Sequence, residues 1–126
     1  MSIHQKDWMI KQIEELIEFS SRIFWRRGFL SYAVNKDNQT ANDLLFIQIN
    51  KLVDGNNICG AEDVLFSAYG GTNNPDFDYL SVVLSFYSRL NGMTDDKLLN
   101  MDFSREEVYD GLNDMLRNFG LPDMKK

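Results

Sequence analysis

Apolar residues recur at helical spacing along most of the chain, and no stretch keeps the two-residue alternation of a strand. Two of the apolar runs stand close together, on either side of Gly55. Each run places its members on one face of a helix: Leu45, Ile49 and Leu52 in the first, and Ala61, Leu65 and Ala68 in the second. Because only two or three residues separate these helices, we expect them to pack as an antiparallel pair.

Six helices are expected, and capping signals mark several of their starts. Thr40 with Asp43 and Ser104 with Glu107 have the spacing of capping boxes. The Asn74-Pro75 dipeptide combines an N-cap residue with a proline suited to the first helical position. The predicted helices cover residues of about 5–27, 41–54, 58–69, 75–90, 95–101 and 105–119.

Glycine and asparagine residues mark the expected helix ends. We expect Gly28 to stop the first helix and Gly55 to take the left-handed conformation that follows the second. Asn56 or Asn57 is then placed to cap the third helix. The helix over 75–90 is apolar around its whole circumference, which predicts that it is the most buried element.

The hairpin over residues 45–68 resembles a tetratricopeptide repeat in its spacing of large and small residues. Repeats of that family recur about every 34 residues. One period further on, Tyr79 and Phe86 suit the first helix of a second repeat, but Asp95 stands where a small residue is needed. We therefore predict an all-α fold, a tetratricopeptide-like bundle of about six helices with short antiparallel connections. It forms a single domain over 1–126, with frayed ends at 1–4 and 123–126.

Three segments carry a second resemblance, which covers most of the chain. They are residues 5–14 (QKDWMIKQIE), 60–66 (GAEDVLF) and 102–108 (DFSREEV). Together they resemble a family of small, uncharacterised proteins from Firmicutes. The resemblance implies a bacterial source and a helical fold, but it implies no activity and no catalytic residues.

Composition and charge exclude several classes of protein. The chain is 44% hydrophobic, which suits a globular domain, and no apolar run approaches the ~20 residues that span a bilayer. With one cysteine and no signal-peptide pattern, a cytoplasmic location is expected. Residues 1–36 hold six Lys or Arg against four acids, whereas residues 37–126 hold seven against fifteen. The acidic body makes general nucleic-acid binding an unlikely function.

None of the reactive residue types forms a catalytic, cofactor-binding or metal-binding pattern. His4 is the only histidine and has no partner in the sequence. Cys59 lacks a nearby base, although the first turn of its helix is expected to lower its pKa. Pairs of acids occur three times, and each pair lies in a predicted first helical turn, where the helix dipole favours carboxylates: Glu62-Asp63, Asp95-Asp96 and Glu106-Glu107.

The first helix carries apolar side chains on two faces. The stripe expected to face the core consists of Ile10, Ile13, Ile17 and Phe24. Trp8 and Phe19 are eleven positions apart, so they lie within about 20° of each other and nearly opposite that stripe. Either the helix is sandwiched inside the fold, or its second face meets a partner.

Aromatic residues and arginine are enriched at binding hot spots, which favours an interaction role for this helix. The candidate interface residues are Trp8, Phe19, Arg22, Trp25 and Arg26. Together with Arg27, the two arginines could pair with the acidic body of a second copy or contact RNA. We expect a non-enzymatic cytoplasmic module for protein–protein interaction, either with another protein or as a homodimer. The alternative is a regulatory domain that binds a small molecule or nucleic acid; it would be supported by a pocket lined with Tyr69, Tyr79, Phe86 and Tyr87.

Overall fold

The computed structural model describes residues 3–70 and 77–120, and all regular structure within these ranges is α-helical, as predicted. The described part of the chain forms six helices: α1 (Ile3–Trp25), α2 (Ala41–Asp54), α3 (Ile58–Gly70), α4 (Phe77–Asn91), α5 (Asp95–Asn100) and α6 (Arg105–Asn118). The Asn74-Pro75 start signal lies outside the described residues, as do most of the ends expected to fray.

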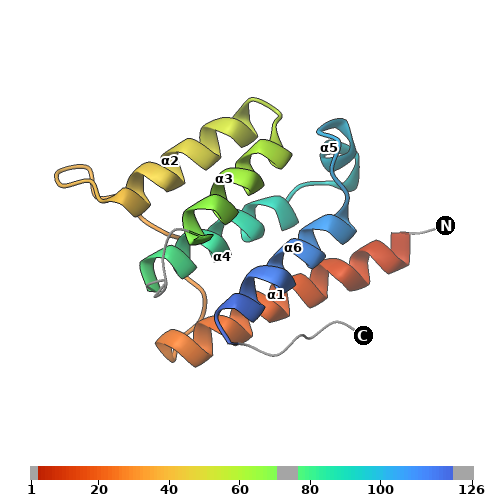
Figure 1. Ribbon diagram of the computed structural model, residues 1–126. Helices are drawn as coiled ribbons and strands as arrows, with labels where there is room; N and C mark the ends of the chain where they lie inside the picture. The colour runs from red at the N-terminus through yellow and green to blue at the C-terminus, as the bar shows by residue number, and fades with distance from the viewer. Residues whose placement is uncertain (1–2, 71–76, 121–126) are drawn as a thin grey trace.

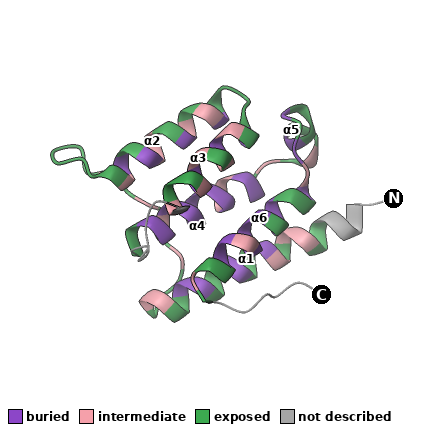
Figure 2. Cartoon of the chain, in the orientation of Figure 1, coloured by how far each residue is buried: buried purple, intermediate pink, exposed green. Residues whose placement is uncertain are grey.

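α4 is the central helix of the bundle. It packs against α1, α2 and α6, while α2 and α3 form the predicted antiparallel hairpin on one side of it (Figure 1). α1 and α6 run side by side on the other side, and their C-terminal ends meet where the rings of Phe24 and Phe119 lie 6.4 Å apart. Buried positions occur around most of α4 (Figure 2). The prediction that this helix is the most buried is therefore confirmed.

Two helix ends differ from the prediction, because the left-handed residue after each helix is not the glycine that was expected there. α1 ends at Trp25, and Arg26 takes a φ of 57° while its N–H donates to the Arg22 carbonyl at 3.0 Å. Gly55 has a φ of −87°, and Asn56 takes the left-handed conformation instead, with a φ of 64°. The predictions for Gly28 and Gly55 were therefore wrong.

The start of α3 follows the prediction, because Asn57 caps it. The N–H of Gly60 donates to Oδ1 of Asn57 at 2.9 Å. The capping boxes at the starts of α2 and α6 are also confirmed, with Thr40 and Ser104 as their N-cap residues. Local sequence patterns thus set most of the helix starts.

A buried carboxylate fastens the segment between α1 and α2, which covers residues 26–40. Asp43 accepts hydrogen bonds from the Thr40 N–H at 2.9 Å and from the Tyr32 hydroxyl at 2.7 Å. The Tyr32 N–H in turn donates to Oγ of Ser85, on α4, at 2.7 Å. This network holds the long connection against both helices.

A buried arginine joins the last three helices. Arg105, in the first turn of α6, donates to the carbonyls of Asn91 at 2.8 Å and Met93 at 2.6 Å. Its Nη2 also forms an ion pair with Asp95 at 2.9 Å. Because Asn91 ends α4, Met93 lies in the turn after it and Asp95 begins α5, one guanidinium fixes the path of the chain from α4 to α5.

Candidate interaction surface

The outward face of α1 carries three large apolar side chains. Trp8 is 52% exposed, Phe19 is 42% exposed and Ile23 is 46% exposed. On the opposite side of the helix, Ile13 and Ile17 are buried in the core. Figure 2 shows the same alternation along α1. The possibility that α1 is sandwiched inside the fold is therefore wrong for the described part of the chain.

The packing of the bundle explains this exposure. α1 packs closely against α4 and α6, and these helices lie on the side of its core stripe. The helical period places Trp8, Phe19 and Ile23 on the other side, within about 60° of one another around the axis. Sequence reasoning missed Ile23, although its spacing of four residues from Phe19 is the signal that could have found it.

Three arginines at the end of α1 are exposed, and they are Arg22, Arg26 and Arg27. Arg22 lies three positions after Phe19, so the two side chains are neighbours on the helix surface. Among the residues that the structure describes, none of these guanidinium groups makes a side-chain hydrogen bond or an ion pair. We call Trp8, Phe19, Arg22 and Ile23 the α1 face.

Trp25 does not join the α1 face, although sequence reasoning placed it among the candidate interface residues. Its ring is half-buried and lies 6.0 Å from that of Phe77 and 6.4 Å from that of Phe24, both in edge-to-face geometry. Tyr69, Tyr79 and Phe119 continue this cluster of aromatic rings. Trp25 therefore closes the end of the bundle where α1, α4 and α6 meet.

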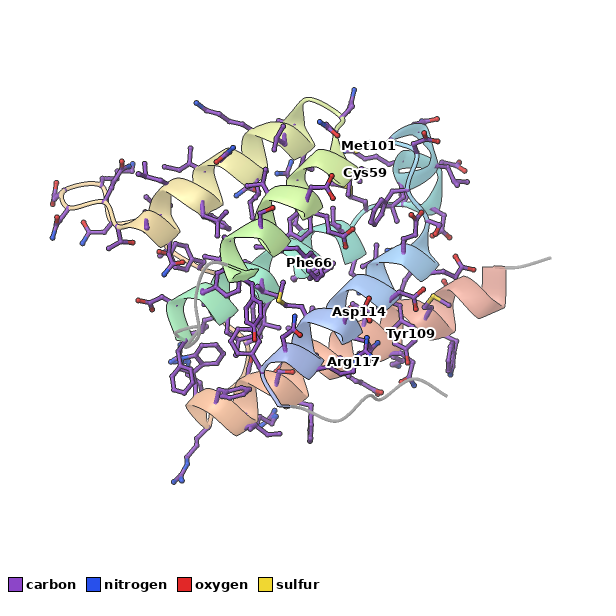
Figure 3. All side chains as sticks on the ribbon, in the orientation of Figure 1. Cys59, Phe66, Met101, Tyr109, Asp114 and Arg117 are labelled. Atoms are coloured by element: carbon purple, nitrogen blue, oxygen red, sulfur yellow. The ribbon has the colours of Figure 1, made fainter. Side chains whose placement is uncertain are left out.

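A groove that the sequence did not predict lies between α3 and α6. It has a volume of about 200 Å³ and is rich in carboxylates. Figure 3 shows Phe66 on α3 and Asp114 on α6, on the two sides of the gap between these helices. We call this feature the acidic groove, and it is lined by Glu62, Phe66, Glu107, Asp110, Gly111 and Asp114.

One wall of the acidic groove contains a partly buried carboxyl group. Oε2 of Glu62 accepts a 2.6 Å hydrogen bond from the buried hydroxyl of Tyr87. Burial raises the pKa of the Glu62 carboxyl, and the negative charge of Glu107 raises it further, although the Tyr87 hydrogen bond acts in the opposite direction. Burial also places the Tyr87 pKa well above its ordinary value.

Gly111 makes this arrangement possible. A Cβ at this position would overlap Oε2 of Glu62 and would lie 2.6 Å from the Tyr87 hydroxyl oxygen. No side chain other than hydrogen fits there unless the pair moves. The first turn of α3 holds no acidic residue, so the prediction that Glu62 and Asp63 lie in a first helical turn was wrong. The sequence pattern also did not predict the contact of Glu62 with Tyr87.

The reactive residues do not assemble into a catalytic arrangement within the described residues. Cys59 is exposed, and its pKa is raised by desolvation and by Glu107. The expectation that the start of α3 lowers this pKa was therefore wrong, because desolvation and then the negative charges of acidic neighbours raise it. The side chain of His4 lies outside the described part of the chain. No group of three or more metal-ligating side chains occurs in the ranges that the structure describes.

The aromatic residues considered as a possible pocket fill the core instead. Tyr79, Phe86 and Tyr87 are buried, and the Tyr79 hydroxyl donates to the Leu65 carbonyl at 2.5 Å. A different groove, of about 450 Å³, lies beside α1 and the end of α4. Its walls combine carboxylate, amide and apolar groups, from Glu14, Ile17, Glu18, Phe29, Ser88, Asn91 and Gly92.

Comparisons with known proteins give one match. Residues 3–120 match a family described as a family of unknown function, DUF6483. No curated protein and no solved structure matches the chain. None of the described helices is long and apolar enough to cross a membrane.

Proposed function

Because the chain belongs to the DUF6483 family, whose function is not known, we propose a function from its own geometry. We propose a non-enzymatic helical module for protein–protein interaction that binds its partner through the α1 face. The observation that carries the proposal is the exposure of Trp8, Phe19 and Ile23 on one side of a helix whose other side is anchored in the core.

The chemistry of the α1 face supports this proposal. Tryptophan and arginine are the residues most enriched at interface hot spots, and aromatic rings contribute large contact areas at a small cost in side-chain entropy. The face belongs to a single helix of 23 residues and runs for about 22 Å from Trp8 to Ile23, so it is already rigid before a partner binds. A second copy of the chain is the first partner to consider.

We propose that the α2–α3 hairpin is tetratricopeptide-like, which is supported by the burial of Ile49, Ala61 and Leu65 at its interface. Ala68 is exposed, which fits a hairpin without a complete second repeat beside it. A cytoplasmic location and a Firmicutes source complete the proposal, and they rest on the composition and on the three resembling segments.

Light scattering coupled to size-exclusion chromatography at micromolar concentration tests the proposal for self-association. We expect an assembly larger than a monomer for the unaltered chain, and a shift toward monomer in Trp8→Ala and Phe19→Ala. Leu99→Ala is the matched control, because Leu99 is 63% exposed on α5 and lies outside the α1 face. A monomeric mass for the unaltered chain at every concentration would contradict self-association through this face.

A second candidate function is the binding of a small organic cation in the groove beside α1 and α4. Its volume of about 450 Å³ is within the range of ligand pockets, about 300–1,000 Å³. Glu14 and Glu18 give one wall negative charge, and Phe29 adds an aromatic surface. We expect agmatine to raise the Tm of the unaltered chain but not that of Glu14→Gln. The absence of any shift at millimolar agmatine would remove this candidate.

A further inference from the structure

We infer that the α1 face of one copy docks against the acidic groove of a second copy, with Arg22 and Arg26 directed at the groove carboxylates. The inference rests on the proposed function and names the partner surface.

The arginine end of the α1 face and the acidic groove carry opposite charge, while exposed Glu15 lies on the same side of α1 nearer the middle of the helix. Residues 1–36 have an excess of two positive charges, and three exposed arginines lie at the end of α1. Residues 37–126 have an excess of eight negative charges, and four of their carboxylates line the acidic groove. Complementary charges of this kind orient two proteins during encounter and disfavour the alternative pairings of like surfaces.

The composition of the acidic groove suits an arginine side chain. A guanidinium group pairs with carboxylates through planar, two-pronged hydrogen bonds, and it also stacks on aromatic rings. Glu62, Asp110 and Asp114 supply carboxylates, and half-buried Phe66 supplies an aromatic ring to the lining of the same groove.

The electrostatics of Glu62 are consistent with an incoming cation. The Tyr87 hydroxyl holds its carboxyl group in the groove, where burial and Glu107 disfavour the charged form. Asp114 already pairs with Arg117 of the same helix. A guanidinium from a second copy would stabilise the ionised form of Glu62, because it adds positive charge beside a partly buried carboxylate.

The contact joins two different surfaces, so it is heterologous. Each copy offers one α1 face and one acidic groove, and a copy that lacks either one can still use the other. A contact between two α1 faces would instead require the same surface on both copies. This difference separates the two arrangements in a mixing experiment.

The experiment uses two variants of the whole chain. Arg22→Glu/Arg26→Glu reverses one charge on the α1 face and one beside it, and Asp110→Lys reverses a charge of the acidic groove. Asp37→Lys is the control, because it makes the same change of charge in the connection between α1 and α2. Sedimentation velocity at micromolar concentration measures self-association, and circular dichroism confirms that each variant is helical.

We expect each variant alone to associate at least about tenfold more weakly than the unaltered chain. Asp37→Lys should associate like the unaltered chain. An equimolar mixture of the two variants should form a one-to-one complex, because the intact face of one copy meets the intact groove of the other. Phe19→Ala provides a face variant without any change of charge, and it should give the same result in place of the arginine variant.

Two results would overturn the inference, and they differ in what they say about the proposed function. If Asp110→Lys associates like the unaltered chain while Phe19→Ala does not, the α1 face binds a surface other than the acidic groove. The inference then fails and the proposed function stands. If the unaltered chain is monomeric at all concentrations, the inference and the proposal of self-association both fail.

Discussion

The hydroxyl of Tyr87, on α4, donates a 2.6 Å hydrogen bond to Oε2 of Glu62, on α3. The bond links the central helix to the α2–α3 hairpin, at the point where α6 also approaches. Burial makes the Glu62 charge unfavourable there, so its pKa is raised above the ordinary value of 4.5. The pair therefore makes the stability of the fold depend on pH.

Glu62→Gln should increase stability at neutral pH. A carboxyl group whose pKa is raised by folding lowers the stability of the folded state at pH values above that pKa, and this loss disappears as the pH falls toward 4.5. Glutamine keeps an acceptor for the Tyr87 hydroxyl but carries no charge. Thermal unfolding should show a higher Tm for Glu62→Gln at pH 7, with a smaller difference at pH 4. Equal Tm differences at both pH values would contradict this account.

Gly111→Ala should destabilise the fold by roughly 1–3 kcal/mol, because the added methyl group overlaps the Glu62–Tyr87 pair. Alanine is the better helix former by about 1 kcal/mol, so a net loss would show that the steric effect prevails. Gly92→Ala is the control, since a Cβ there meets its nearest neighbour at 3.5 Å. Urea unfolding measures both variants. A Gly111→Ala variant as stable as the unaltered chain would show that the pair moves freely.

Arg105→Ala should be the most destabilising of these substitutions, with a loss of roughly 3–5 kcal/mol. It removes the buried guanidinium that binds the carbonyls of Asn91 and Met93 and the carboxylate of Asp95. Arg117→Ala, on the exposed side of the same helix, should cost less than about 1 kcal/mol. Similar urea midpoints for the two variants would contradict the assigned role of Arg105.

Tyr32→Phe should weaken the fold and reduce its sensitivity to acid. The Thr40 N–H, and after it the Tyr32 hydroxyl, lowers the pKa of Asp43 below its ordinary value of 3.8. A lowered carboxyl pKa stabilises the folded state above pH 3.8, and this stabilisation is lost as the pH falls through the lowered value. Removal of the hydroxyl should cost roughly 1–3 kcal/mol at pH 7. Urea midpoints at pH 7 and pH 3 should lie closer together than those of the unaltered chain.

Local patterns in the sequence predicted the helices well, because a cap and its partner lie within three residues of each other. Thr40 and Ser104 are N-cap residues where the pattern placed them. The residues with left-handed backbone conformation were missed, because a glycine near each helix end was the expected choice. Arg26 and Asn56 adopt the conformation instead. Arg105 was also missed, because its partners come from α4, from the turn after it and from α5, and no local signal indicates their carbonyl groups.

The candidate site was predicted in part for a similar reason. The helical period alone places Trp8 opposite the core stripe, and the structure leaves it exposed. Trp25 was placed with it because its ring neighbour Phe77 lies far away in the sequence. The acidic groove depends on the approach of α3 to α6, which the spacing of residues within either helix does not determine.

The most direct test of the central claim measures whether the α1 face becomes covered. In a Trp25→Phe variant, Trp8 is the only tryptophan, so acrylamide quenching of its fluorescence reports the exposure of this face. Because Trp8 is 52% exposed in the single chain, quenching should be strong at nanomolar concentration. It should weaken as the concentration rises into the micromolar range, and Phe19→Ala should prevent that change. Quenching that stays equally strong at every concentration would contradict the claim that a second copy covers the α1 face.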